Sequence, residues 1–322
     1  RGTASKIYTG APMPTGPDGI SPDTVLMQED CRVSDDRVVI PNGIKRGANR
    51  RFAGEDVKQG ARILEAGTRL RPQDIGLAAA VGRTELTVCK PLRVAIFSTG
   101  DEVRDPGTDA PGGTIYDSNR HTVSALLRGL GCTVIDMGIL PDRFDAIRGG
   151  LEDAAGKADM ILTTGGVSTG GEDHVRSAVD ALGSLHFWRL AIKPGRPVAL
   201  GQVGKVPFVG LPGNPVAVMV TFLRIARPLI QRLSGAADTE PALFPVRAGF
   251  DYKKKRDRRE YVRVTLTRTG AHGLEAVKFE REGAGILSSM VAADGLVELP
   301  EDCTGVKAGD IVDYLPFSEV GL

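Results

Sequence analysis

The sequence is short of features that mark several classes of protein. Its 322 residues include only four cysteines, Cys31, Cys89, Cys132 and Cys303. These lie far apart and form no CxxC pair, so neither a zinc site nor a disulfide framework is predicted. We expect the four thiols to be buried and reduced.

The chain also lacks an excess of charge of either sign. Its 41 basic side chains nearly balance 40 acidic ones, for a formal net charge of +1, so no overall field favours nucleic acid or an anionic membrane. No stretch approaches the roughly 18 apolar residues of a spanning helix, and no signal segment opens the chain. We expect no nucleic-acid partner, no membrane and a cytoplasmic location. Because the first residue is Arg1, we also expect that the natural beginning is absent.

Glycine, in contrast, is abundant. There are 41 glycines, about twice the share expected from the roughly 7% average. They cluster at the ends of apolar runs, as in Gly165-Gly166 and the segment from Gly210 to Gly213. Such clusters are typical of turns that approach a ligand closely. Hydrophobic residues at 41% and charged ones at 25% indicate a soluble globular protein.

Length and local pattern divide the chain into four parts. A chain of this size exceeds one hydrophobic core. We predict a β-rich domain at 1–58, a connecting part of a split domain at 59–91, an α/β domain at 92–235 and a C-terminal β domain at 240–322. Short strands are expected at 24–27, 38–40 and 62–64, and a helix that begins at Pro72.

The central part alternates β-like and helical runs. Alternation with short glycine-containing links predicts a parallel sheet covered by helices on both faces, a doubly wound α/β fold. Strands are expected at 93–97, 132–137, 160–162, 185–192 and 208–209. Helices are expected from about 118, at 144–155, at 173–182 and at 215–233.

Polar residues follow these strands. Ligands of open parallel sheets bind beyond the carboxyl ends of the strands. Glycine amides, helix starts and the charges of Lys193 and Arg196 favour a phosphate-bearing ligand. The nearby carboxylates indicate Mg²⁺, because a hard cation reconciles them with phosphate. They are Asp101, Glu102, Asp142 and Asp173.

Each of these features also has a purely structural interpretation. The turn at 163–171 is neither a P-loop nor GxGxxG and can be a tight connection only. Asp173 suits the start of a helix, and Asn214 with Pro215 forms a good N-cap pair. The basic run at 253–259 is typical of a solvated hairpin. His121 and His174 have no metal-ligand partners at useful spacing, which indicates surface or capping roles.

Seven segments together carry a family resemblance. They are Tyr8 to Pro14, Gly54 to Val57, Phe97 to Glu102, Ile115 to Asn119, Thr164 to Ser168, Lys193 to Pro197 and Gly210 to Pro215. In this order and spacing the chain resembles the molybdopterin molybdenumtransferase family, which includes the E domain of gephyrin. The resemblance covers essentially the whole chain. It implies a β-rich domain, a small connecting domain, a molybdopterin-binding α/β domain and a C-terminal β-barrel.

The resemblance also implies an activity and its partners. Members of the family are homodimers with a cleft shared between subunits. They take molybdate and adenylylated molybdopterin, cleave the adenylate in a step that depends on Mg²⁺, and release AMP. Molybdopterin adenylyltransferase would supply the substrate, and apo-molybdoenzymes would receive the product.

Residue by residue, the resemblance implies a set of site residues. The catalytic acids would be Asp56, Glu102, Asp142 and Asp173, with Asp142 and Asp173 on Mg²⁺. The substrate-binding residues would be Thr9, Thr99, Gly100, Asp117, Asn119, Gly165, Gly166, Ser168, Lys193, Arg196, Pro212, Asn214, Arg263 and Ser288. Of these, Arg263 and Ser288 match positions associated with molybdate.

Two departures and two alternatives stay open. Arg189 stands where bacterial relatives often carry lysine. The planar guanidinium of arginine offers a fork of donors in place of the single charged group of lysine. The segment 16–23 is longer than usual. An adenylylating enzyme of the same superfamily is the nearest alternative, but it lacks the flanking β domains. A non-catalytic dimeric scaffold of the gephyrin type is the other.

Overall fold

The computed structural model describes residues 2–16, 19–167, 174–269 and 273–321. The chain divides into two compact units, Arg1–Glu65 with Pro72–Gly82 and Ala66–Arg71 with Arg83–Leu322. We call them the first and second units and describe each by itself. The predicted four-domain boundaries remain a prediction.

The first unit has little regular structure. It contains η1 (Gln28–Asp30), a hairpin of β1 (Arg32–Ser34) and β2 (Arg37–Val39), and helix α1 (Pro72–Ala80). The helix begins at the predicted proline, which needs no amide partner at that position. The strands predicted at 24–27 and 62–64 do not form. Local β propensity is not sufficient without a neighbouring strand to pair with.

The second unit contains a six-stranded sheet in the order β6-β3-β7-β11-β10-β8. Its strands are β3 (Arg93–Thr99), β6 (Thr133–Leu140), β7 (Met160–Thr164), β8 (Gly183–Arg189), β10 (Pro197–Val203) and β11 (Val206–Leu211). The first four in spatial order are parallel to one another, and β10 runs antiparallel to both of its neighbours, β11 and β8. The sheet is therefore parallel, as expected, except for β10. A two-residue turn joins β10 to β11, and so short a link permits only antiparallel pairing.

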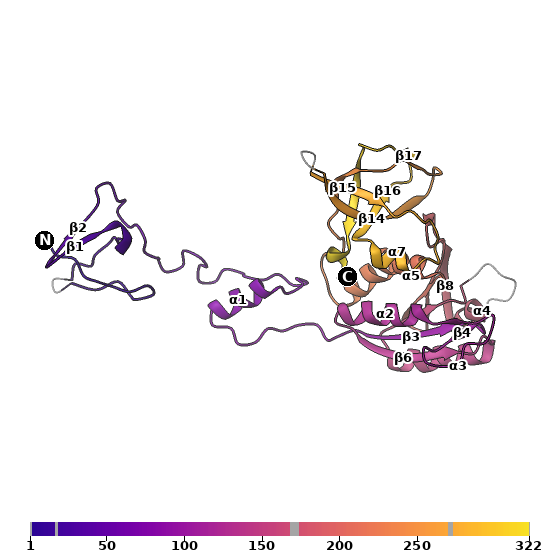
Figure 1. The fold of residues 1–322 in the computed structure, drawn as a ribbon. Coiled ribbons are helices and arrows are strands. Elements are labelled where there is room, and N and C mark those ends of the chain that lie inside the picture. Colours follow the sequence, from indigo (N-terminus) through magenta and orange to yellow (C-terminus); the bar gives the residue numbers. More distant parts are fainter. Residues whose placement is uncertain (1, 17–18, 168–173, 270–272, 322) are drawn as a thin grey trace. The chain divides into compact units, whose positions relative to one another are not determined.

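Helices cover both faces of this sheet, which confirms the doubly wound arrangement (Figure 1). The helices are α2 (Ser118–Gly129), α3 (Phe144–Lys157), α4 (His174–Leu182), α5 (Pro215–Thr221) and α6 (Arg227–Leu233). Along β3, Val94 and Ile96 pack with α2, α5 and α6, while Ala95 and Phe97 pack with α3 and α4. Both sets are fully buried, so the strand is apolar on both faces. Within the described ranges, every helix is too short or too polar to cross a lipid bilayer.

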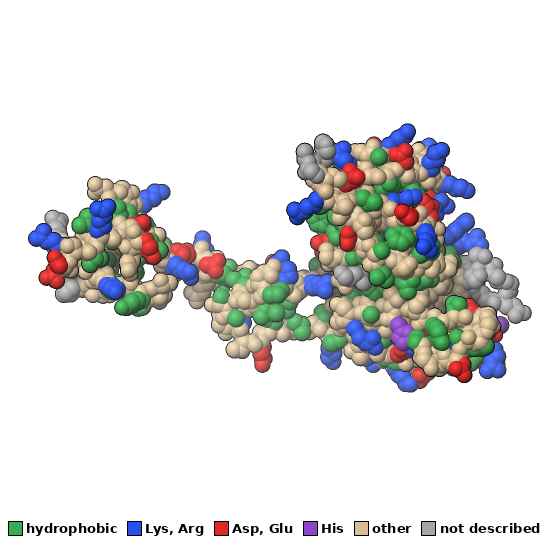
Figure 2. Space-filling view, viewed as in Figure 1, with side chains coloured by type: hydrophobic (Ala, Val, Ile, Leu, Met, Phe, Trp, Pro, Cys, Tyr) green, Lys and Arg blue, Asp and Glu red, His purple; other side chains and the backbone are tan. Residues whose placement is uncertain are grey.

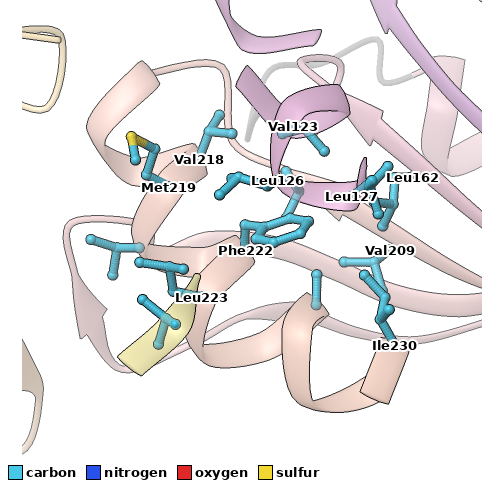
Figure 3. Close-up of a cluster of buried hydrophobic side chains, with 14 of the residues drawn as sticks. Val123, Leu126, Leu127, Leu162, Val209, Val218, Met219, Phe222, Leu223 and Ile230 are labelled. Carbon is cyan, nitrogen blue, oxygen red and sulfur yellow. The ribbon is translucent and has the colours of Figure 1, made fainter. Parts of the chain in front are cut away.

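The long helix predicted at 215–233 is interrupted. A π-helical turn, η2 (Phe222–Ala226), separates α5 from α6. Pro228 lacks an amide hydrogen and its ring would clash with the carbonyl of Arg224, so a regular α-helix cannot continue through it. The turn places Phe222 in the core, where Figure 3 shows its ring beside Leu126 and Leu127 of α2.

The C-terminal part is a β-barrel, as expected. Strand order β15-β12-β18-β16-β14 closes through a further pairing of β15 with β14, which removes free edges. Its elements are β12 (Phe244–Ala248), β14 (Arg259–Thr269), β15 (Gly273–Lys278), β16 (Gly295–Leu299) and β18 (Ile311–Pro316), with β13 (Tyr252–Lys253), β17 (Gly305–Val306), α7 (Ser288–Ala292) and η4 (Phe317–Val320) outside that ring. Strand β9 (Ile192–Lys193) adds to β14 in parallel and places Lys193 opposite Glu260. The barrel is therefore joined to the α/β part at a predicted site residue.

The cysteines follow the prediction only in part. All four are free. Cys132 is buried, which raises the pKa of its thiol to about 11. Cys31 and Cys303 are half-buried and Cys89 is exposed, so burial of all four thiols was a wrong expectation.

Candidate active site

A cavity of about 970 Å³ opens at the carboxyl ends of β3, β7 and β11 and extends to the barrel. Its volume lies in the range of about 300–1,000 Å³ that is usual for small-molecule sites. Eleven predicted site residues line it, namely Thr99, Gly100, Glu102, Asp142, Gly165, Gly166, Lys193, Arg196, Pro212, Asn214 and Arg263. The strand ends of the sheet therefore form one wall of this cavity, as the sequence predicts.

Two carboxylates stand on the α/β wall. The hydroxyl of Thr99, at the end of β3, donates to Oδ1 of Asp142 over 3.3 Å. Glu102 lies beside Gly100, where an added Cβ would come within 2.8 Å of Oε2. Gly100 has a φ of +137°, so both its backbone and its neighbour favour glycine.

These carboxylates have the oxygen donors that Mg²⁺ prefers. The third predicted acid, Asp173, lies outside the described residues. In the described part of the chain, no three acidic, histidine or cysteine side chains gather as a metal-binding group. Glu102 and Asp142 therefore have suitable chemistry for a cation, and the complete ligand set stays a prediction.

The glycine turn after β7 is closely packed. Gly165 and Gly166 have φ values of +85° and +67°, a region that L side chains rarely adopt. A Cβ on Gly165 would meet the carbonyl oxygen of Thr99 at 2.8 Å, and one on Gly166 would meet Val175 at 2.5 Å. This turn needs glycine to fit between the ends of two elements, which supports its structural interpretation beside the functional one.

Lys193 is held at the cavity wall by the barrel. Its Nζ lies 3.2 Å from the hydroxyl of Tyr252 and 3.4 Å from Oε2 of Glu260. The Tyr252 hydroxyl donates to the same carboxylate over 2.7 Å, and Arg258 donates to its other oxygen over 2.6 Å. Glu260 is almost completely buried. This cluster fixes the ammonium group of Lys193 in place.

The surroundings of this cluster determine its charge. Burial alone would raise the pKa of Glu260, but hydrogen bonds from Tyr252 and Arg258 and the charge of Lys193 bring it below its ordinary value. Burial and the bond to Glu260 raise the pKa of Tyr252. Glu260 therefore stays ionised and Tyr252 stays a hydrogen-bond donor at neutral pH.

A second basic group comes from the barrel strands. Arg263 donates to the carbonyl oxygens of Gly283 and Arg281 over 2.9 and 3.3 Å. Burial lowers its pKa, and its buried Nε has no hydrogen-bond partner among the described residues. Lys278 forms an ion pair of 2.7 Å with Glu282 at the same wall. Arg263 therefore lines the cavity with a guanidinium group whose hydrogen-bonding capacity is not filled by the described residues.

Several predicted residues lie elsewhere. Asp117 is buried and caps α2 by accepting from the amide of Arg120 over 3.0 Å. Asn119 donates to the carbonyl of Gly213 over 2.7 Å and so supports a turn of the wall. Ser288 is exposed at the start of α7 and is not among the lining residues. In contrast, Asn214 does line the cavity, and it occupies the N-cap position of α5 without a capping hydrogen bond from its side chain.

Two predicted residues belong to the first unit, and two lie outside the described residues. Thr9 and Asp56 are exposed in the first unit. Ser168, like Asp173, lies outside the described residues. Their roles stay predictions.

Several residues that line the cavity were not predicted from the sequence. The missed lining residues include His174, Tyr252, Lys278 and Glu282, and Arg189 was noted only as a departure. The surface or capping interpretation of His174 overlooked its place in the wall. Arg258 belongs to the run interpreted as a solvated hairpin, yet it contacts Glu260. Tyr252 lies between two charged residues and Lys278 between two apolar ones, and neither pattern gives a local signal of a site.

The cavity carries more positive than negative side chains. Five lining cations face three lining carboxylates and one histidine. On the face shown in Figure 2, basic and acidic side chains intermingle over the second unit. The excess of positive charge is therefore local to the cavity, which favours an anionic ligand with a few acidic groups beside it.

Comparison with known proteins connects an α/β layer of this kind to molybdopterin, and it also matches the two parts of the chain on either side of that layer. Residues 95–232 match the family model described as a probable molybdopterin binding domain. Residues 1–82 match the MoeA N-terminal region (domain I and II), and residues 245–317 match the MoeA C-terminal region (domain IV). The second unit is thus of the molybdopterin-binding class.

Individual relatives identify the family. A molybdopterin molybdenumtransferase of Haemophilus influenzae is 36% identical, with 99% of this chain and 78% of that protein covered. One from Nostoc is 33% identical, with 96% and 71% covered. The solved structure of a molybdopterin biosynthesis MoeA protein from Pyrococcus horikoshii OT3 aligns with a TM-score of 0.73 at 28% identity, over 91% of this chain and 71% of that one. The chain belongs to the molybdopterin molybdenumtransferase family.

Proposed function

We propose that this protein transfers molybdenum from molybdate to adenylylated molybdopterin and releases AMP. The observation that carries the proposal is the cavity in which Glu102 and Asp142 face Lys193, Arg196 and Arg263. An adenylylated, phosphorylated pterin needs cationic donors along its phosphates and oxygen ligands for a cation beside them. The relatives' names agree with this chemistry.

The charge of each lining residue suggests which part of the substrates it would bind. Lys193, steadied by Tyr252 and Glu260, and the exposed Arg196 would bind the phosphates of the substrate. Glu102 and Asp142, with Asp173, would hold Mg²⁺, which when bound spreads the charge that develops as the phosphoanhydride breaks. Arg263, with its unpartnered Nε, would bind molybdate together with Ser288.

The chemical step needs positioning more than a protein nucleophile. An oxygen of molybdate would attack the adenylate phosphorus, and the bond from that phosphorus to the bridging oxygen would break. The bridging oxygen would leave on the pterin phosphate, and AMP would carry away the molybdate oxygen while molybdenum passes to the dithiolene sulfurs. Oxygen-18 molybdate should therefore label AMP, and unlabelled AMP would exclude this route.

We also propose a homodimer. The first unit exposes Tyr8, Val33 and Phe52, with 73%, 68% and 54% of each accessible. Large apolar side chains exposed in such a small unit favour a surface that another chain covers. Thr9 and Asp56 would reach a cleft shared with the partner. A molybdopterin adenylyltransferase and apo-molybdoenzymes would be its functional partners, in the cytoplasm.

The alternatives explain less of the molecule. An adenylyltransferase-like enzyme would lack the flanking regions that match MoeA models at 1–82 and 245–317. A pure scaffold has no need for two carboxylates opposite a group of cations in a cavity. The transferase accounts for both features.

The test is AMP release by the purified protein with adenylylated molybdopterin, Mg²⁺ and molybdate, followed by reconstitution of an apo-molybdoenzyme. Asp142→Asn should lower the rate about 100-fold or more by removing a charge beside the phosphates, with no change in oligomeric state. Asp159→Asn is the matched control, because Asp159 pairs with Arg93 at the other end of β3. Full activity of Asp142→Asn would exclude the proposed site. A parallel assay with tungstate measures the choice of metal.

A further inference from the structure

Arg120, in the first turn of α2, is a buried arginine just outside the cavity. Only 4% of its surface is accessible. Its guanidinium donates from Nε to Asp117 over 3.0 Å and from Nη1 to both oxygens of Asp136 over 2.7 Å. Its Nη2 bonds to Asp105. One side chain therefore joins three carboxylates: Asp105 and Asp117 from the loop that leads into α2, and Asp136 from a strand.

The first of these segments carries Glu102. Asp105 belongs to the loop of residues 100–117, which contains β4 (Val103–Arg104) and β5 (Ile115–Tyr116). The loop is tied to itself where the amide of Ile115 donates to the carbonyl of Glu102 over 2.8 Å. Both Glu102 and Ile115 line the cavity. Holding Asp105 therefore holds the loop that presents Glu102.

The second segment carries Asp142. Asp136 lies on β6, which ends at Leu140, immediately before Pro141 and Asp142. Asp136 also accepts from the amide of Gly138 over 2.9 Å, within the same strand. The guanidinium thus bridges the loop behind Glu102 and the strand that leads to Asp142.

Arginine is suited to this bridge in a way that lysine is not. Its planar group has donors on three nitrogens in a rigid fork, whereas an ammonium is a single point charge. Burial works against its charge, but hydrogen bonds to Asp136 and Asp117 raise the pKa of Arg120 above its ordinary value. The guanidinium of Arg120 therefore stays charged at neutral pH.

We propose that Arg120 is a positioning residue. It holds the loop of residues 100–117 and the end of β6 in a fixed relative position, so that the carboxylates of Glu102 and Asp142 both face the cavity. The catalytic consequence rests on the proposed function. The mechanical consequence, restraint of the loop, does not.

The experiment compares Arg120→Lys and Asp105→Asn with the control Asp159→Asn, which breaks an equally close carboxylate–arginine pair far from the cavity. Rates of AMP release give kcat and KM, and hydrogen–deuterium exchange reports on amides 101–117. Because misplacement of reacting groups costs up to about 100-fold, Arg120→Lys should lower kcat by about that factor and Asp105→Asn by about tenfold. KM should change less than about twofold, since Lys193 and Arg196 are untouched.

Exchange in the loop should accelerate in both variants and not in the control. Wild-type kcat and wild-type loop exchange in Arg120→Lys would overturn the proposal. If that variant does not fold, the same result in Asp105→Asn overturns it, because Asp105 is about half exposed and its loss leaves the core intact. A wild-type protein that releases no AMP would refute the proposed function instead, and loop exchange would still decide the role of Arg120.

Discussion

The two units of the molecule differ in what holds them together. The second unit contains three clusters of buried apolar side chains, two on the faces of the sheet and one inside the barrel. In the described part of the first unit, Ala78 is the only apolar side chain that is buried. Burial of apolar area is the main favourable term in folding. The second unit therefore has its own source of stability, and the first does not.

Strand length shows the same contrast. The hairpin of the first unit has strands of three residues, and every residue in them is exposed. An isolated two-stranded hairpin is marginal in water at best. In the second unit, β3 has seven residues and six of them are buried. The comparison indicates that the first unit needs contacts beyond its own to become stable, which agrees with the proposed dimer.

Separating the units should produce the largest effect. A fragment of residues 1–82 should show no cooperative thermal transition by circular dichroism, because it cannot bury a core. A fragment of residues 83–322 should unfold cooperatively, even though it loses the bond from the Ala237 amide to Gly67. The complete chain is the control. A cooperative transition in the shorter fragment would break the comparison, because it would show that the first unit folds alone.

One phenylalanine from each unit sharpens the contrast. Phe222→Ala should lower the free energy of unfolding by about 3–5 kcal/mol, because it leaves a cavity in a packed core. Phe52 is 54% exposed and its ring lies 4.2 Å from the guanidinium carbon of Arg50. Phe52→Ala should change the stability of the second unit by less than about 0.5 kcal/mol. Denaturant titration followed by tryptophan fluorescence measures both, and equal losses would contradict the assignment of the core.

The sequence predicted the second unit well because its signals are local. The apolar run of β3 and the helical spacing of Val123, Leu126 and Leu127 each lie within a few residues, and both were confirmed. Strand β10 was missed because Pro197 and Gly201 weaken its β pattern. It forms because β11 and β8 pair with it on both sides. Tertiary pairing of this kind leaves no trace in a short window of sequence.

The residues of the candidate site show the same difference between local sequence signals and tertiary pairing. Glu102, Asp142 and Gly165 were predictable, because the fold rule for parallel sheets places strand ends at one edge. Tyr252 and Lys278 were not, because only the pairing of β9 with β14 brings the barrel to Lys193. That contact depends on how two domains meet, and no motif encodes it.

The smallest of these effects is a difference between the two units in how their free energy of unfolding depends on pH. The pKa of Glu260 is lowered in the folded state, so its ionisation stabilises the protein above the ordinary value of 4.5, and this stability is lost as the pH falls through the folded-state pKa. Glu260→Gln should lower the free energy of unfolding of the second unit by about 1–3 kcal/mol at pH 7, since a buried group loses its charge-assisted bonds. It should also reduce the loss of stability between neutral and acid pH.

Asp23→Asn in the first unit is the control. The pKa of Asp23 is lowered by hydrogen bonds from Thr24 and Arg46, and this substitution should leave the pH dependence of the second unit unchanged. Equal pH profiles for wild type and Glu260→Gln would mean that the buried carboxylate contributes nothing to the junction of barrel and sheet.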